Sequence, residues 1–308
     1  MTLGVVLALG AGVLSALPLL VPGGLLFALL SPLPLFLVGL SQGLRGVTIA
    51  ALAACGITVL LAGPLGALSI AIVLAGPAVL LVRQALLNRP APDGGLEWYP
   101  PGQMIIWLTG IGVVWMFLSI MLLGSGSEGI EATLRADFDE ALALMVPEMQ
   151  EQARNRMSDL AVPFALGAGP LAWLGVLAVN GILAQGALLR LGRALRPAPD
   201  IKQMELPRWL DVTAAVVLAV ALLASGDIGY IAQNLLILLL LPYLFAGLAV
   251  AHRWIGRTGA AAPLLLVPLY VLLLLGWVAP LVVGLGLIDQ VVGHHRRKSG
   301  GRPDQEEE

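Results

Sequence analysis

The stretch that decides the fold is Ile231–Arg253, with the sequence IAQNLLILLLLPYLFAGLAVAHR. Its apolar run from Leu235 to Val250 is interrupted only by Pro242, Tyr243 and Gly247. At about 1.5 Å of rise per helical residue, a segment of this length crosses a hydrocarbon core of roughly 30 Å. The stretch therefore predicts a transmembrane helix.

The rest of the chain repeats this unit of an apolar span and a short loop. Its 308 residues are 58% hydrophobic and 12% charged, whereas soluble domains carry roughly 25% charged residues. Lipid must solvate so much apolar surface. The single cysteine, Cys55, allows no intrachain disulfide. The first residues, MTLGVVLALGAG, lack a basic region and predict a retained first span rather than a cleaved signal peptide.

These features predict an all-α fold: a polytopic integral membrane helical bundle of about 8–10 transmembrane helices. Turn chemistry separates the spans at Pro22-Gly23-Gly24, Ser41-Gln42-Gly43 and Gly63-Pro64. The candidate spans are Leu3–Leu20, Leu25–Leu40, Gly46–Leu61, Leu65–Val82, Met104–Leu123, Ala161–Leu189, Val212–Ala224, Ile228–Ala251 and Ala261–Ile288.

Basic residues in alternate loops predict the orientation, because cytoplasmic loops carry an excess of Lys and Arg. They fall on one side of the membrane if the N-terminus is cytoplasmic. We therefore expect an inner-membrane protein with both termini in the cytoplasm. The residues are Arg45, Arg83, Arg89, Arg190, Arg193, Arg196, Lys202, Arg208, Arg253 and Arg257.

The last apolar segment, Ala261–Ile288, has two interpretations. Two short crossings hinged near Gly276 and Pro280 keep the basic tail His294–Lys298 on the cytoplasmic side. One long helix places that tail outside, against the charge rule. We prefer the two short crossings.

The predicted domains are an N-terminal block of six spans over residues 1–190, a cytoplasmic linker over 191–208, a C-terminal block over 209–293 and a disordered cytoplasmic tail over 294–308. Within the first block, residues 125–160 form an acidic extracytoplasmic loop. Ile130, Leu134, Phe138, Leu142 and Met145 lie on one face of an amphipathic helix there. A second short helix is expected from Pro147 through Arg156. This helical loop lies against the membrane interface or covers an outward-facing cavity.

Small residues recur every fourth position in the first span, at Gly4, Ala8, Gly12 and Ala16. Such a strip lets another helix approach closely. It is either ordinary packing within the chain or a helix-docking face for a partner membrane subunit.

Polar groups inside the spans need partners, since hydrocarbon offers none. They are either interhelical hydrogen bonds or the lining of a ligand cavity, with Asn180 and Asn234 as the deepest amides. For Asp289 a surface pairing with His294 or Arg296 is a further alternative. The candidates for a ligand cavity are Asn180, Gln185, Gln233, Asn234, Tyr243 and Asp289.

Catalytic motifs are missing from the sequence. There is no HExxH, GxSxG, P-loop or intramembrane pair of aspartates, and the three histidines, His252, His294 and His295, stand beside basic residues. We expect no enzyme, no metal site, no cofactor and no nucleic-acid partner. The lipid bilayer is the certain partner, and a small-molecule ligand has no signature.

Two patches carry a family resemblance. One is NLLILLLLPYLFAGLAVAH (234–252) followed by LGLIDQVVGHHRRK (285–298), and the other is SPLPLFLVGLSQGLRGVTIAALAACG (31–56). Both resemble the YybS-like family of predicted bacterial membrane proteins, which has no assigned function. That family more distantly resembles the substrate-binding S components of energy-coupling-factor vitamin transporters.

The resemblance implies a solute-binding transport component that docks to a partner subunit through a strip such as Gly4, Ala8, Gly12 and Ala16. The chain departs from S components in its larger number of spans and its acidic outer loop. The alternative is a structural or scaffolding membrane protein that recruits partners through small-residue helix faces and basic cytoplasmic loops.

Overall fold

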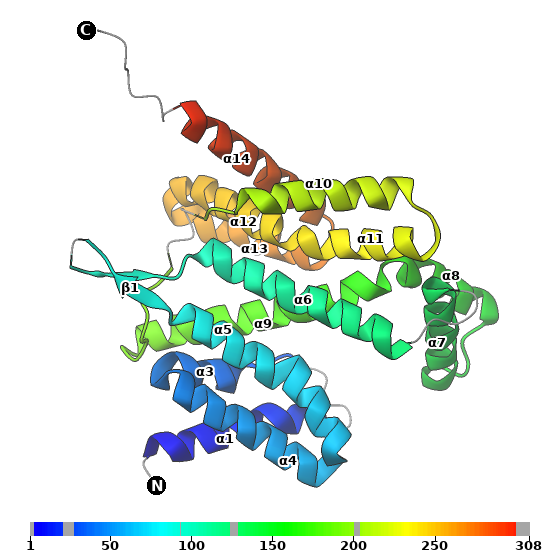
Figure 1. Cartoon of the computed structure of the whole chain (residues 1–308), viewed down its shortest axis with the longest axis horizontal. Coiled ribbons are helices and arrows are strands. Elements are labelled where there is room, and N and C mark those ends of the chain that lie inside the picture. The colour runs from blue at the N-terminus through cyan, green and yellow to red at the C-terminus, as the bar shows by residue number, and fades with distance from the viewer. Residues whose placement is uncertain (1–2, 21–27, 93, 124–128, 200–203, 300–308) are drawn as a thin grey trace. The chain divides into compact units, whose positions relative to one another are not determined.

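The computed structural model describes residues 3–20, 28–92, 94–123, 129–199 and 204–299. These residues are helical apart from a short β-hairpin and connecting turns (Figure 1), which confirms the predicted all-α membrane bundle. The α-helices are α1 (Leu3–Leu20), α3 (Leu33–Gln42), α4 (Leu44–Ile70), α5 (Gly76–Ala85), α6 (Pro101–Leu123), α7 (Ile130–Met145), α8 (Glu151–Ala161), α9 (Ala165–Arg190), α10 (Arg208–Leu223), α11 (Gly226–Leu239), α12 (Leu241–Ile255), α13 (Ala262–Leu274) and α14 (Ala279–Ser299). Shorter elements are the π-helix η1 (Ala71–Ala75), the 3₁₀ helices η2 (Val162–Phe164) and η4 (Gly256–Ala261), and the strands β1 (Asn88–Pro90) and β2 (Leu96–Trp98).

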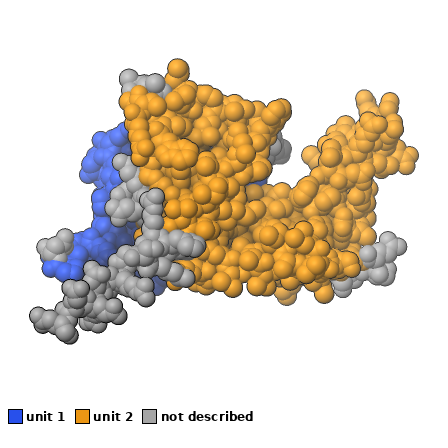
Figure 2. Space-filling view, turned by 90° about the horizontal axis from the view of Figure 1, so that it is seen from above, with its two compact units in different colours: residues 1–100, 172–199 blue, residues 101–171, 200–308 orange. Residues whose placement is uncertain are grey.

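The chain folds into two compact units, which Figure 2 colours separately. Unit 1 comprises Met1–Pro100 and Ala172–Pro199, and unit 2 comprises Pro101–Leu171 and Asp200–Glu308. This division differs from the two consecutive blocks expected on either side of residues 191–208. The reason is α9, whose first residues belong to unit 2 and whose remainder belongs to unit 1.

The outer surface is apolar, as a lipid-solvated protein requires. Large side chains such as Leu60 and Leu223 are 81% and 87% exposed. Within the described residues, four helical runs are long and apolar enough to cross a membrane: Leu44–Ala85, Pro101–Leu123, Glu151–Arg190 and Gly226–Gly259. Shorter apolar helices are Leu3–Leu17, Leu33–Gln42, Leu264–Leu273 and Ala279–Gly293.

In unit 1, α1 packs closely on α4 because both helices present small residues at the contact. A Cβ added to Gly12 would lie 2.1 Å from the carbonyl oxygen of Ala50. Ala8 and Ala16, one turn on either side of Gly12, are fully buried. Larger side chains do not fit between helices this close, and dispersion contacts between the two backbones stabilise the pair instead.

The docking strip predicted on the first span is therefore already covered. Gly12 contacts α4 and Gly4 approaches Gln42 at the end of α3, within the same chain. Ala8 and Ala16 have no exposed surface to offer a partner helix. This arrangement matches the alternative of ordinary packing within the chain.

The chain reverses direction at Gly63, where the sequence predicted a break. Gly63 has φ 75° and ψ −178°, and Pro64 follows it. Gly39 of α3 lies close to both Val47 and Val82. A straight helix would hold those two valines roughly 50 Å apart at 1.5 Å per residue. The 42-residue run Leu44–Ala85 thus contains two antiparallel passes.

We predict that Gly12→Ala destabilises unit 1, since the added methyl group overlaps the Ala50 carbonyl. Overpacking of this kind costs about 1–3 kcal/mol. The matched control is Gly10→Ala, because no atom lies within 4 Å of a Cβ at Gly10. Thermal unfolding in detergent measures both variants. Equal melting temperatures for the two would contradict the close α1–α4 contact.

In unit 2, the stretch that decides the fold forms α11 and α12, joined at Leu240 with Pro242 in the first turn of α12. α11 packs on α10, and α12 packs on α14. The second contact again depends on glycine. A Cβ at Gly247 would lie 1.8 Å from the Val282 carbonyl oxygen, and one at Gly286 would lie 2.0 Å from that of Tyr243.

The final apolar segment is two helices and not one. Gly276, with φ 78°, lies between α13 and α14. α14 contacts α12 at Gly286, and Arg253 near the end of α12 donates to Asp289 of α14 at 2.7 Å. α12 and α14 pack on each other and run in the same direction, and α13, which connects them in the chain, runs the opposite way (Figure 1). The expected hinge is confirmed and the single long helix is excluded.

The acidic loop forms the two helices α7 and α8. Arg135 pairs with Asp159 at 2.7 Å and the Ser158 hydroxyl donates to Asp139, so α7 and α8 lie side by side. The predicted start of the second helix at Pro147 is wrong by four residues. Pro147 lies in the turn after Met145, and α8 begins at Glu151.

The predicted linker over 191–208 is more ordered than a free connection, in the part that the structure describes. Arg196 is 5% exposed and is bonded within unit 1. Met204 and Leu206 are buried in a core of unit 2 that includes Leu210 and Tyr243. Arg196 thus fixes one end of the segment, and the apolar residues Met204 and Leu206 fix the other. Of the disordered tail predicted over 294–308, residues 294–299 continue α14 as a helix, and the rest lies outside the described residues.

Candidate functional site

The deepest predicted cavity residue, Asn234, holds a helix break together. Its Oδ1 accepts from the Gly167 N–H at 2.8 Å, and its Nδ2 donates to the Pro163 carbonyl at 3.0 Å. In an uninterrupted helix, Gly167 N–H would bond directly to the Pro163 carbonyl. The side-chain amide of Asn234 lies between these two groups and bonds to both.

Tyr230, one turn before Asn234 on α11, serves the same break. Its hydroxyl donates to the Val162 carbonyl at 2.6 Å. In the 3₁₀ turn η2 the Val162 carbonyl also accepts from the Ala165 N–H, so the Tyr230 hydroxyl is a second donor to it. Asn234 is fully buried and also donates to the Tyr230 carbonyl at 3.0 Å. Both N–H groups of its amide are therefore bonded within the protein, and its Oδ1 accepts one bond from the backbone.

Tyr243, also predicted for the cavity, is fully buried in the core of unit 2. Its hydroxyl donates to Asp211 of α10 at 2.6 Å. Gln233, the residue before the buried Asn234 on α11, is exposed. Its side chain reaches the Ala221 carbonyl only at 3.5 Å, the outer limit of a hydrogen bond.

Asp289 pairs with Arg253, and this partner differs from the His294 or Arg296 expected from sequence. The two side chains are 36% and 28% exposed. A pair this close to solvent contributes little stability, about 0–1 kcal/mol. The side chains of His294 and Arg296 lie outside the described residues, so the pairing expected from sequence stays a prediction. Arg253 is distant in sequence and comes close because α14 returns to the end of α12.

The two remaining candidates, Asn180 and Gln185, lie on the part of α9 in unit 1. Asn180 Nδ2 donates to the carbonyls of Leu29 and Val176, at 2.7 and 2.8 Å. Its Oδ1 is buried and has no hydrogen-bond partner among the described residues, and the same holds for the Ser31 hydroxyl. Asn180 and Asn234, the deepest amides among the candidates for a ligand cavity, thus belong to different units.

Gln185 leads to a second feature, which sequence reasoning missed. It donates to the Arg196 carbonyl at 2.7 Å. The buried Arg196 guanidinium donates in turn to the carbonyls of Ala85 at 3.0 Å and Tyr99 at 2.9 Å. Burial lowers the pKa of this guanidinium, but arginine stays charged at neutral pH.

These bonds bring the ends of three helices together. The Leu195 N–H donates to the Leu40 carbonyl at 3.1 Å, so the residues after α9 lie at the end of α3. Arg196 joins them to the end of α5. We call this region the basic end of unit 1. It comprises Arg45, Arg83, Arg89, Arg190, Arg193 and Arg196.

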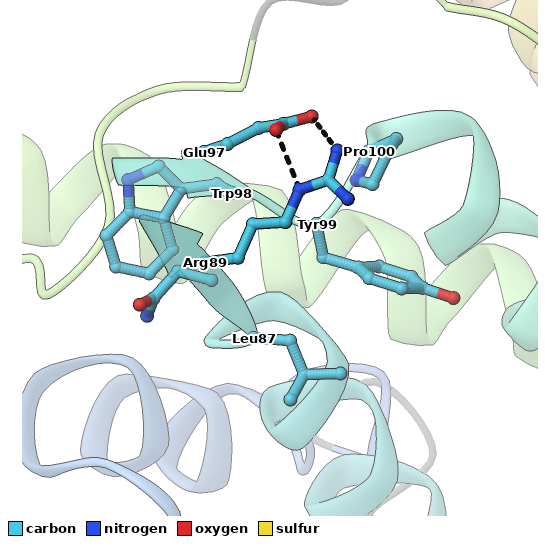
Figure 3. A pocket seen from close by; sticks show the side chains of 7 residues that line it. Leu87, Arg89, Glu97, Trp98, Tyr99 and Pro100 are labelled. Atoms are coloured by element: carbon cyan, nitrogen blue, oxygen red, sulfur yellow. Dashed lines mark hydrogen bonds and ion pairs between the residues drawn. The ribbon is translucent and has the colours of Figure 1, made fainter. Parts of the chain in front are cut away.

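A pocket of about 330 Å³ opens beside the β-hairpin at this end. Arg89 and Glu97 face each other across β1 and β2, with Nε to Oε2 at 2.8 Å and Nη2 to Oε1 at 3.0 Å (Figure 3). The lining residues are Leu87, Asn88, Arg89, Glu97, Trp98, Tyr99 and Pro100.

A family model matches residues 11–290 and is described as "Predicted membrane protein (DUF2232)". The chain belongs to the DUF2232 family. The match spans both units and includes every candidate cavity residue. No curated protein and no solved structure matches the chain. The DUF2232 description supports membrane residence, while the likenesses to the YybS-like family and to transporter S components stay resemblances.

The β-hairpin of this DUF2232 protein had a usable sequence signal. The run PAPDGG at 90–95 contains an Asp-Gly pair, a strong turn signal, before Leu96, Trp98 and Tyr99. Arg196 had no such signal, because its carbonyl partners come from residues about a hundred positions away. No group of three or more His, Cys, Asp or Glu suited to a metal occurs in the described part of the chain.

We predict that Asn234→Ala lowers the stability of unit 2 by about 1–3 kcal/mol, because the buried Gly167 N–H and Pro163 carbonyl lose their partners. Gln233→Ala, the neighbouring amide on the exposed face, should stay within about 0.5 kcal/mol. Denaturant unfolding in detergent compares them. A harmless Asn234→Ala would show that the break does not depend on the amide.

Proposed function

We propose that this DUF2232 protein is a structural membrane protein that recruits partners at the basic end of unit 1. One observation supports the proposal more than any other. Most amides and hydroxyls predicted to line a cavity are bonded to the protein itself, whereas the basic end exposes several arginines. The proposal includes residence in the inner membrane, cytoplasmic termini and no enzymatic activity.

The exposed arginines are what a partner would meet. Arg45, Arg83, Arg190 and Arg193 are exposed and form no ion pair with any described carboxylate. A cluster of unpaired guanidinium groups attracts an acidic surface and speeds its association. The positive-inside rule places this end in the cytoplasm. We infer that the partner is a protein with an acidic cytoplasmic face.

The small-residue faces have a lesser part in this proposal than the sequence suggested. The strip on α1 is occupied by α4, and the glycines of α12 and α14 contact each other's helix. Recruitment therefore depends on charge at the helix ends rather than on close helix packing within the membrane.

We predict that the triple variant with Arg45→Gln, Arg190→Gln and Arg193→Gln loses its specific neighbours. A photo-crosslinking residue at Leu191, which is 68% exposed, reports them in native membranes by mass spectrometry. The expected result is a reproducible acidic partner that disappears with the triple variant and at raised salt.

The control changes charge in the other unit, by Arg154→Gln and Arg156→Gln in α8. It should leave the crosslinks intact. Identical crosslinks in the wild type and the triple variant would refute recruitment by the basic end.

A second function, a solute-binding transport component, is favoured by Asn180 and Ser31. Their buried oxygen atoms have no partner in the part of the chain that the structure describes. An unsatisfied buried acceptor costs roughly 1–3 kcal/mol, and a polar ligand in unit 1 would recover that energy. The resemblance to transporter S components supports the same function, with the ligand still to be identified.

We predict for this second function that a vitamin and cofactor set contains a compound that raises the melting temperature of the wild type and not of Asn180→Ala. Asn234→Ala serves as a control with an equal loss of an amide in unit 2, and it should keep the shift. A set without any stabilising compound, or a shift that survives Asn180→Ala, would count against solute binding in unit 1.

A further inference from the structure

The pocket beside the β-hairpin combines an apolar lining with a guanidinium at its edge. Leu87, Trp98 and Pro100 supply apolar surface, and Arg89 and Glu97 cross the two strands. In the view of Figure 3, the rings of Trp98 and Tyr99 extend to opposite sides of Arg89. A ligand that fits such a lining has both an apolar part and a negatively charged part.

The Arg89 guanidinium is held in place and keeps donors to spare. Glu97 accepts from Nε and Nη2, while arginine carries five N–H donors in a rigid fork. Nη1 makes no hydrogen bond with the described residues, and Arg89 is 75% exposed. The fork therefore presents oriented N–H groups to the solvent, in the geometry that suits phosphate oxygens.

Glu97 opposes an anion at the same place. The Arg89 guanidinium donates to Glu97 and lowers the pKa of this carboxyl, so Glu97 is negative at neutral pH. The surrounding arginines shift the balance toward anions. Arg83 precedes the pocket on the last turn of α5, and Arg190 and Arg193 lie on the segment that Arg196 fastens to Tyr99.

The depth of the pocket in the membrane follows from its residues. Trp and Tyr favour the interface between headgroups and acyl chains. The hairpin follows α5, whose residues belong to an apolar run, and precedes α6, another candidate span. Phosphate headgroups of anionic lipids lie at this level, and basic residues beside a span attract them.

We propose that the β-hairpin pocket binds the phosphate of an anionic lipid headgroup, with Arg89 as the phosphate ligand and Trp98 against the apolar part. This inference goes beyond the recruitment of a protein partner, because lipid binding requires no second protein. The same guanidinium chemistry recognises free phosphate, so the experiment must separate the two sources.

The test uses the full chain purified in a neutral detergent, and native mass spectrometry counts bound lipid. Phosphatidylglycerol, phosphatidylcholine and inorganic phosphate are titrated separately. Arg89→Gln should weaken phosphatidylglycerol binding roughly five-fold, the factor that corresponds to about 1 kcal/mol per basic residue at a membrane surface. Glu97→Gln should strengthen it by a similar factor, because a competing charge is removed.

The matched control is Arg156→Gln on α8, which removes one exposed arginine from the other unit and should leave binding unchanged. Opposite effects of Arg89→Gln and Glu97→Gln support the pocket. If inorganic phosphate displaces phosphatidylglycerol with the same dependence on Arg89, phosphate recognition stands and the soluble ion is the source.

Equal binding of phosphatidylcholine and phosphatidylglycerol would overturn the proposal. So would unchanged binding in both pocket variants, or changes of the same sign in both. These outcomes leave partner recruitment unaffected, because the crosslinking variants change neither Arg89 nor Glu97 and the lipid assay contains no partner.

Discussion

Each backbone carbonyl that loses its helical donor in an apolar medium has to find another one, and this constraint organises both units. Hydrocarbon supplies no hydrogen bonds, so an unpaired carbonyl costs several kcal/mol there. The chain breaks its helices repeatedly, at prolines, at a π-helix and at 3₁₀ turns. At two of these places, η1 and η2, a side chain from another helix donates to a backbone carbonyl.

Different types of side chain donate the hydrogen bonds to carbonyls at the helix breaks. Asn234 and Tyr230 bond to the carbonyls at η2. Trp173 donates its indole N–H to Val73 within η1 at 2.8 Å. Such bonds connect residues that are far apart in sequence, and they hold helices in register where small residues alone would allow sliding. Polar residues within the spans therefore serve the fold in most cases, which leaves few of them for a solute.

Charged side chains gather at particular helix ends within each unit. The arginines of unit 1 meet at one end because the bonds of Arg196 and Leu195 draw three helix ends together. In unit 2 the acidic residues of α7 and α8 lie near the start of α11, where Asp227 caps α7 through the Ile130 N–H at 2.9 Å. Arg253 and Asp289 lie at the end of α12. Both proposals follow from the arginine-rich end, where Arg45, Arg83, Arg190 and Arg193 are exposed and form no ion pair with a described carboxylate.

The amino-acid sequence by itself determined the medium, the helical class and most of the breaks. Apolar run lengths, Gly63-Pro64 and Gly276 act locally, through hydrophobicity and backbone freedom, so they are visible without a structure. The amphipathic period of Ile130 to Met145 predicted α7 for the same reason. Only the tertiary structure decided which polar groups pair. Asn180 and Asn234 look equivalent in sequence, yet one lies in each unit with different partners. Arg196 and Asp289 bond to groups distant in the chain, and α4 covers the strip of Gly12. Pairings over such distances depend on how helices fold back, and no local pattern encodes that.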